Sequence, residues 1–237
     1  MKAMKTASKP APRFQDYTKT WIKTEALSEK KKRAAKILSI LKKTYPNARM
    51  ILNYSNNTQL LVAVILSAQC TDKKVNEVTV RLFKKYKTAR DFANAKPAEL
   101  EKMIYQTGFY HAKAKSIIGA AQKIDADFGG KLPRTMTEAL TLPGVARKTG
   151  NVILGNAYNI VEGTAVDTHV ARLAQRLGLS HETDPVKIEK DLMALFPQDE
   201  WFKLTYCLID HGRAICTAQR RTCEVCPLNK ICPSTLV

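Results

Sequence analysis

Residues 142–154 read LPGVARKTGNVIL, a stretch that predicts a tight turn leading into a helix. The Pro-Gly pair is typical of a turn, and the apolar run at 152–154 indicates that the helix enters a hydrophobic core. Arg147 and Lys148 stand at the start of this helix, where the positive end of the helix dipole disfavours cations. Because Asp or Glu would be more stable there, the sequence predicts a negatively charged ligand or a chemical role at this position.

The residues on either side of the turn predict a helix-hairpin-helix. Residues 137–142 would end the first helix, residues 143–146 would form the turn, and the second helix would begin at Arg147. Such a turn leaves backbone N–H groups at the start of the new helix without partners, and these groups suit a phosphate oxygen. We therefore expect Gly144, Ala146 and Arg147 to contact a DNA backbone, with an ordinary αα-hairpin as the alternative.

Lys148 has the features of a nucleophile. The helix N-terminus and the neighbouring Arg147 disfavour its charged form, which would leave a free amine able to form a Schiff base. Asp167, in VDTHVARL, is expected to cap the next helix, and amine attack at a sugar C1′ also needs a carboxylate to take a proton or balance charge. His169 is a candidate second contact in the same site, although a lone histidine is more often structural.

The charge of the chain indicates a polyanionic partner. The 237 residues carry a formal charge of +18, and residues 1–50 contain 14 Lys and Arg against 3 Asp and Glu. Nucleic acid is the first candidate, with a solvated basic tail as the alternative, and residues 1–25 read as a flexible basic arm. The longest apolar run, 60–66, is too short for a membrane helix of ~20 residues, and no secretory signal is recognisable. We expect an intracellular, DNA-associated protein with no membrane contact.

The hydrophobic pattern predicts an all-α fold. Apolar residues recur with a helical period in several segments: 34–45, 75–86, 117–128 and 170–177. Pro97 and Pro185 fit the first turns of two further helices. The run at 60–66 fits a strand or a buried helix, and we favour a buried central helix because no alternating strand pattern accompanies it. The basic run at 30–33 is expected on a solvated helix face rather than in a nuclear-localisation patch.

A cysteine cluster lies near the C-terminus. Four of the six cysteines are separated by gaps of six, two and five residues: Cys216, Cys223, Cys226 and Cys232. Disulfides are disfavoured inside cells, and structural zinc usually shows two Cys-x-x-Cys pairs, so the spacing favours a 4Fe–4S cluster, with zinc and disulfides as alternatives. Arg220 and Arg221 lie between the first two cysteines, where a rigid cluster would hold them toward a phosphate backbone. Cys70 and Cys207 read as core or near-core thiols.

The motifs occur together and in order. LLVAVILSAQCTD is followed by LPGVARKTGNVIL, VDTHV and the Cys-x6-Cys-x2-Cys-x5-Cys tail. This set resembles the endonuclease III family, the iron–sulfur members of the helix-hairpin-helix DNA glycosylases, over roughly residues 30–233. The resemblance implies a bilobal, monomeric, all-α protein that binds damaged duplex DNA in a cleft with the base flipped out. It implies these divisions: a barrel lobe of six helices at 52–160 with the hairpin at about 137–155, and a second lobe of 26–51 plus 161–237 with a cluster loop at 216–232.

The resemblance also implies residue roles. Lys148 would be the Schiff-base nucleophile and Asp167 the carboxylate that assists it. Gln69 would fill the gap left by the flipped nucleotide, and Phe109 would wedge into the duplex, with ordinary packing as the alternative for Phe109. The implied reaction is excision of an oxidised pyrimidine followed by β-elimination at the abasic sugar. The cluster would be structural and would tune DNA affinity.

Two positions depart from the family pattern. Ala146 replaces a usual glycine of the hairpin, which predicts somewhat altered DNA affinity, and Gly150 replaces a usual alanine, which predicts some loss of helix stability. Three other functions remain open: a thymine-mismatch glycosylase, a pyrimidine-dimer glycosylase and a non-catalytic iron–sulfur DNA-binding module. An adenine-mismatch glycosylase is disfavoured because that enzyme usually lacks the lysine and carries a further C-terminal domain.

Overall fold

The computed structural model describes residues 17–237, so most of the predicted basic arm, residues 1–16, lies outside the described part. The described residues form helices and loops, and their only strand-like pairing is an isolated bridge between Cys216 and Arg221. The all-α prediction is confirmed. None of the described helices is both long and apolar enough to cross a membrane. The chain divides into two compact units, one of residues 49–165 and one that joins the chain before residue 49 to residues 166–237.

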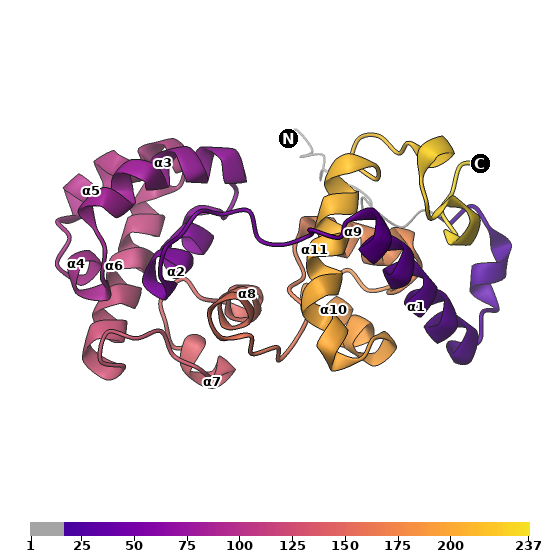
Figure 1. Cartoon of the computed structure of the whole chain (residues 1–237), viewed down its shortest axis with the longest axis horizontal. Helices are drawn as coiled ribbons and strands as arrows, with labels where there is room; N and C mark the ends of the chain where they lie inside the picture. The colour runs from indigo at the N-terminus through magenta and orange to yellow at the C-terminus, as the bar shows by residue number, and fades with distance from the viewer. Residues whose placement is uncertain (1–16) are drawn as a thin grey trace, which may run out of the picture. The chain divides into compact units, whose positions relative to one another are not determined.

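A buried helix forms the centre of the unit at 49–165. Every residue of α2 (Asn57–Leu66) after the first is buried, and Asn56 caps the helix by accepting from the N–H of Gln59. The helix is apolar all round, which is the pattern of a core helix, and the prediction for residues 60–66 is confirmed. The helices around it are α3 (Asp72–Lys85), α4 (Ala89–Ala93), α5 (Pro97–Ile104), α6 (Tyr110–Asp127), α7 (Met136–Ala139) and α8 (Arg147–Tyr158) (Figure 1). The unit thus has seven α-helices where the resemblance implied six, and α4 and α7 are only five and four residues long.

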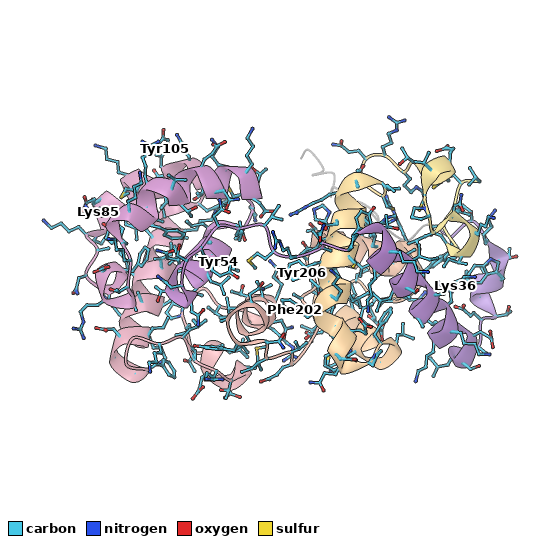
Figure 2. All side chains as sticks on the ribbon, viewed as in Figure 1. Lys36, Tyr54, Lys85, Tyr105, Phe202 and Tyr206 are labelled. Carbon is cyan, nitrogen blue, oxygen red and sulfur yellow. The ribbon has the colours of Figure 1, made fainter. Side chains whose placement is uncertain are left out.

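The other unit is built on a long helix close to the C-terminus. That helix, α11 (Gln198–Ala214), packs against α9 (Thr168–Arg176) and α1 (Leu27–Thr44), and α10 (Pro185–Leu195) completes the helical core. Pro185 occupies the first turn of α10, as the sequence predicts, and the side chain of Asp184 caps this helix. Short 3-10 helices, η3 (Cys223–Val225) and η4 (Asn229–Ile231), lie in the cysteine loop. In both units lysines cover the outer faces of helices, as Lys36 on α1 and Lys85 on α3 illustrate (Figure 2).

Residues 17–25 differ from the predicted flexible arm. They contain a 3-10 helix, η1 (Thr20–Lys23), whose Ile22 is buried. The backbone N–H groups of Thr18 and Lys19 both donate to the carbonyl of Pro233 at 2.9 Å. Ile22 packs over Gly178, where an added Cβ would lie only 2.7 Å from Ile22 Cδ1. The segment is therefore part of the folded unit.

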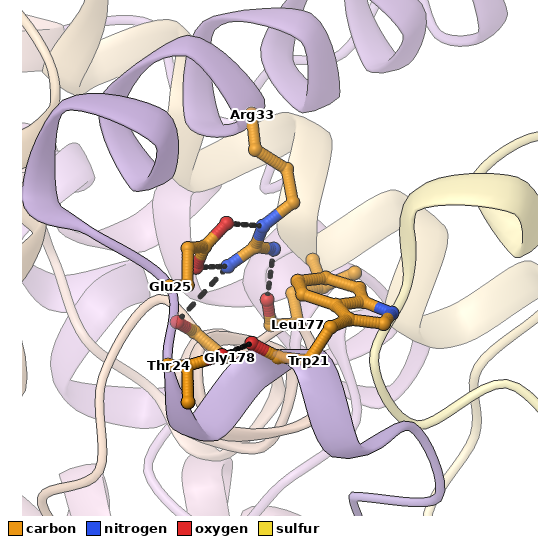
Figure 3. A network of polar contacts seen from close by, with 6 residues as sticks. All are labelled: Trp21, Thr24, Glu25, Arg33, Leu177 and Gly178. Carbon is orange, nitrogen blue, oxygen red and sulfur yellow. Dashed lines mark hydrogen bonds and ion pairs between the residues drawn. The ribbon is translucent and has the colours of Figure 1, made fainter.

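Arg33 corrects the prediction of a fully solvated basic face at residues 30–33. Its guanidinium makes a two-point ion pair with Glu25, and both side chains are 8% exposed. It also donates to the carbonyls of Leu177 and Gly178 at the end of α9, and Trp21 lies beside it with 5.3 Å between guanidinium carbon and ring centre (Figure 3). A buried guanidinium needs such a full set of partners, and here it fastens the N-terminal segment to α9.

Candidate functional site

The hairpin turn has the geometry that its Pro-Gly pair predicts. The N–H of Val145 donates to the carbonyl of Leu142 at 3.1 Å, and Gly144 has φ of +79°. This is a β-turn with proline at its second position and glycine in the left-handed conformation that L residues resist. A Cβ on Gly144 would lie 2.7 Å from Cβ of Ser116 on α6, so the glycine also permits close packing. The first helix ends earlier than predicted, since α7 stops at Ala139.

The second helix of the hairpin begins at Arg147, as predicted. Its N-cap, Ala146, has an ordinary extended conformation (φ −95°, ψ 173°) and offers no side-chain acceptor, so no side chain caps α8. Lys148 is exposed on the first turn of α8. An uncapped helix start with an exposed amine is a surface that can receive an anion and react with an electrophile.

Gly150 has a packing reason that the sequence did not reveal. An added Cβ would lie 2.5 Å from Sδ of Met136, a buried residue of α7. The glycine thus lets α7 and α8 approach closely inside the hairpin. Glycine in place of alanine at this position makes room for the side chain of Met136, so the substitution does more than lower helix propensity.

Asp167 is the N-cap of α9, as the sequence predicts. One carboxylate oxygen, Oδ1, accepts from the N–H groups of His169 and Val170, both at 2.8 Å. The second oxygen, Oδ2, is not used by this cap, and the side chain is half-buried. Asp167 belongs to the unit that contains α9, and Lys148 belongs to the unit at 49–165. The cap therefore fixes the carboxylate while leaving one oxygen for other chemistry.

His169 is held by a neighbouring guanidinium. Nη2 of Arg172 lies 3.2 Å from its Nδ1, close enough for the guanidinium to donate to this nitrogen of a neutral ring. Burial lowers the pKa of His169, and nearby Arg172 and Arg213 act in the same sense while Asp167 opposes them. This arrangement gives His169 a structural partner and a fixed ring orientation.

Gln69 and Phe109 lie in exposed loops of one unit with unusual backbone conformations. Gln69 has φ of +52° and Phe109 has φ of +47°. Left-handed backbone at bulky non-glycine residues costs of the order of 1–3 kcal/mol and persists only where the surroundings enforce it. The Phe109 side chain is 67% exposed, so ordinary packing in the core does not explain a phenylalanine at this position.

The four clustered cysteines surround one cavity. Cys216, Cys223, Cys226 and Cys232 all line it, and none of the six cysteines forms a disulfide. Burial raises the pKa of Cys232 to about 12 and also raises that of Cys226, so a bound cation would have to stabilise the thiolates. Among the described residues, no three His, Cys, Asp or Glu side chains are gathered tightly enough to hold one metal ion.

Two residues that the sequence analysis missed contact these thiols. Nη1 of Arg176 lies 3.3 Å from Sγ of Cys216, and Nε2 of buried His211 lies 3.5 Å from Sγ of Cys226. Both residues are buried on helices of the same unit. The sequence could have indicated them, because both lie on the inner, apolar face of their helix, and a charged or polar residue there needs a buried partner.

The two arginines of the cysteine loop differ. Arg220 is exposed, whereas Arg221 is half-buried, lines the cysteine cavity and donates to the carbonyl of Ser234 at 3.1 Å. The guanidinium of Arg221 thus braces the loop internally. Of the two side chains, that of Arg220 is the more exposed.

Comparisons with known proteins identify the family. Residues 62–198 match the model of the HhH-GPD superfamily base excision DNA repair proteins. The chain is 52% identical to endonuclease III of Synechocystis sp., covering 88% of this chain and 95% of that protein. It is 44% identical to endonuclease III of Bacillus subtilis, covering 79% and 86%. A solved structure of a trapped endonuclease III–DNA covalent intermediate is similar with a TM-score of 0.83 and 39% identity, covering 86% of this chain and 96% of that one. The chain therefore belongs to the endonuclease III family of base excision repair DNA glycosylases.

Proposed function

We propose that this glycosylase excises oxidised pyrimidines from duplex DNA and then nicks the strand, with Lys148 as the nucleophile for both steps. The observation that carries the proposal is the exposed amine of Lys148 on the uncapped first turn of α8, directly after the Pro-Gly turn. A related protein has been captured as a covalent DNA intermediate, which fits a nucleophilic mechanism. Uncapped N–H groups at the same helix start would bind a DNA phosphate and bring the sugar to the amine.

The proposed chemistry begins with the lysine nitrogen. Nζ of Lys148 forms a bond to C1′ while the bond from C1′ to the base breaks, and the base leaves with the bonding electrons and takes a proton. The amine then loses one proton, and the ring oxygen takes a proton as its bond to C1′ breaks, which gives a protonated Schiff base. Removal of a proton from C2′ then expels the 3′ phosphate by β-elimination, and water finally releases the lysine.

Asp167 is proposed as the carboxylate that assists this attack. A carboxylate takes the amine proton or balances the positive charge that develops on the sugar. The N-cap bonds of Oδ1 fix the carboxylate, and Oδ2 is not used by the cap. We propose His169 as a neighbouring polar contact whose orientation depends on Arg172.

The DNA contacts are proposed from exposure and backbone geometry. Gln69 and Phe109 are exposed on strained loops and would enter the duplex where the damaged base leaves the stack. Gly144, Ala146 and Arg147 would hold a phosphate, and Arg220 would contact another. The formal charge of +18 supports a DNA partner, and we propose that the protein acts as a monomer on DNA inside the cell.

We propose that the cysteine loop holds a 4Fe–4S cluster. Four thiols line one cavity, and their gaps of six, two and five residues fit the asymmetric spacing that a cluster tolerates. Cys216, Cys223, Cys226 and Cys232 would be the ligands. When bound, the cluster would cross-link the loop, and Arg176 and His211 would contact its sulfur ligands.

Borohydride trapping with abasic-site DNA tests the proposed function. The native protein is expected to form a covalent adduct, and Lys148→Ala is expected to abolish it. Lys123→Ala is the matched control, since Lys123 pairs with Asp127 on α6 and takes no part in the site. Duplexes with single lesions then separate an oxidised-pyrimidine enzyme from thymine-mismatch and pyrimidine-dimer glycosylases. Trapping that survives Lys148→Ala would reassign the nucleophile, and no trapping by the native protein would favour a non-catalytic module.

A further inference from the structure

A buried lysine lies beneath the two strained loops of the unit at 49–165. Lys113, on the first turn of α6, is 5% exposed. Its ammonium donates to the carbonyl oxygens of Leu66 at 2.9 Å and Thr107 at 2.7 Å. Burial lowers the pKa of Lys113, and the nearby Cys70 opposes this effect. The amine is bonded to backbone carbonyls, and among the described residues no carboxylate pairs with it, which is a rare and costly arrangement for a lysine.

The two carbonyls mark the starts of the two loops. Leu66 is the last residue of α2, and Gln69 follows three residues later. Thr107 ends a short 3-10 helix, η2 (Tyr105–Thr107), and Phe109 follows two residues later. One ammonium group therefore ties together two chain segments that lie about forty residues apart in the sequence.

The loops need such a restraint. Gln69 and Phe109 are two of the three non-glycine residues with positive φ among the described residues. The third, Asn159, is of a type that tolerates this conformation and ends a helix. Glutamine and phenylalanine do not adopt it readily, so the surrounding structure must hold them there. Lys113 is the group placed to hold both.

A design for stability alone would choose another residue at 113. The position lies one helical turn before Ile117, on the buried stripe of α6, where an apolar side chain would pack without desolvating a charge. The lysine satisfies the end carbonyl of α2, where a cation is also favoured by the helix dipole. The free energy lost by burying this charge is then offset by the restraint that its hydrogen bonds place on the two loops, rather than by packing in the core.

We propose that Lys113 is a positioning residue that locks the Gln69 and Phe109 loops together, so that both side chains enter a damaged duplex as one preformed unit. The proposal rests on the proposed DNA roles of those two residues. In this role Lys113 itself contacts neither DNA nor the reacting sugar. Its effect passes through the carbonyls of Leu66 and Thr107.

The test compares Lys113→Met with native protein in single-turnover excision of thymine glycol from a duplex. The expected loss is roughly tenfold, corresponding to about 1.4 kcal/mol. A 2-aminopurine placed opposite the lesion is expected to lose most of its fluorescence increase on binding, because the duplex is no longer opened. Trapping on single-stranded abasic DNA, which needs no opening, is expected to stay within about twofold. Lys123→Met is the control, since it removes an equal side chain from α6 far from the loops.

A double-mutant cycle separates this role from a general structural one. In a Gln69→Ala/Phe109→Ala background, Lys113→Met is expected to change excision by less than about twofold, because its targets are gone. Two results would overturn the proposal. One is a further tenfold loss of the excision rate when Lys113→Met is added to that background, and the other is an excision rate of the single variant Lys113→Met that equals that of the native protein. Native protein that fails to trap abasic DNA would instead refute the proposed function.

Folding is checked by circular dichroism before any rate is compared. If Lys113→Met does not fold, Lys113→Arg keeps donors for both carbonyls and is expected to retain most of the 2-aminopurine signal. A folded Lys113→Arg with native thermal stability and no signal would contradict the proposed restraint.

Discussion

Replacing Gly144 by alanine is expected to damage the hairpin in two separable ways. At φ of +79°, an L residue costs about 1–2 kcal/mol relative to glycine. The new Cβ would also lie 2.7 Å from Cβ and 3.0 Å from Oγ of Ser116, an overlap that costs a further ~1–3 kcal/mol. The free energy of unfolding of the unit at 49–165 should therefore fall by about 2–5 kcal/mol.

Urea denaturation followed by circular dichroism measures this loss, and Ser116→Gly separates its two parts. The double variant removes the overlap but keeps the left-handed alanine, so the coupling energy between the two substitutions should be about 1–3 kcal/mol in the stabilising direction. Affinity for abasic-site duplex should fall together with stability, because the turn moves away from α6. A Gly144→Ala protein within ~0.5 kcal/mol of native stability would refute the argument from both φ and packing.

Three further changes test other parts of the structure. Glu25→Ala leaves a buried guanidinium without its carboxylate and should lower the free energy of unfolding by about 3–5 kcal/mol. Glu29→Ala removes one partner of an exposed ion pair and should lower it by less than ~1 kcal/mol. Equal losses in the two variants would contradict the argument from burial. Ala146→Gly should tighten DNA binding about twofold, or ~0.4 kcal/mol, by removing a methyl beside the uncapped helix start, and unchanged binding measured by anisotropy would show that the turn does not meet phosphate. Cys226→Ser should lose iron and the visible absorbance of the purified protein while Cys70→Ser keeps both, and full iron in Cys226→Ser would remove it from the ligand set.

Local signals predicted much of this structure. The start of α8, the Pro-Gly turn, the cap at Asp167 and the buried helix around residues 60–66 all depend on residues within a few positions of one another. Such features follow from dihedral preference, capping chemistry and hydrophobic period, which a sequence displays directly. They were sufficient to locate the hairpin and its amine.

Features that depend on distant neighbours were not predictable. In the sequence, Arg33 reads as one more exposed residue of a lysine-rich run. In the folded chain its guanidinium donates to the carbonyl of Leu177, which lies 144 positions away. Lys113 depends in the same way on Leu66, 47 positions earlier. The need of Gly150 for the space beside Met136 is also set by packing between two helices. The burial of a charge is decided by partners that only the folded chain brings together.

Mass-spectrometric mapping of the borohydride-reduced adduct with abasic DNA identifies the nucleophilic residue. After proteolysis, the sugar remnant is expected on the peptide that contains Lys148, attached to its Nζ. A remnant on any other lysine or on the N-terminal amine, with Lys148 unmodified, would contradict the assignment of the nucleophile.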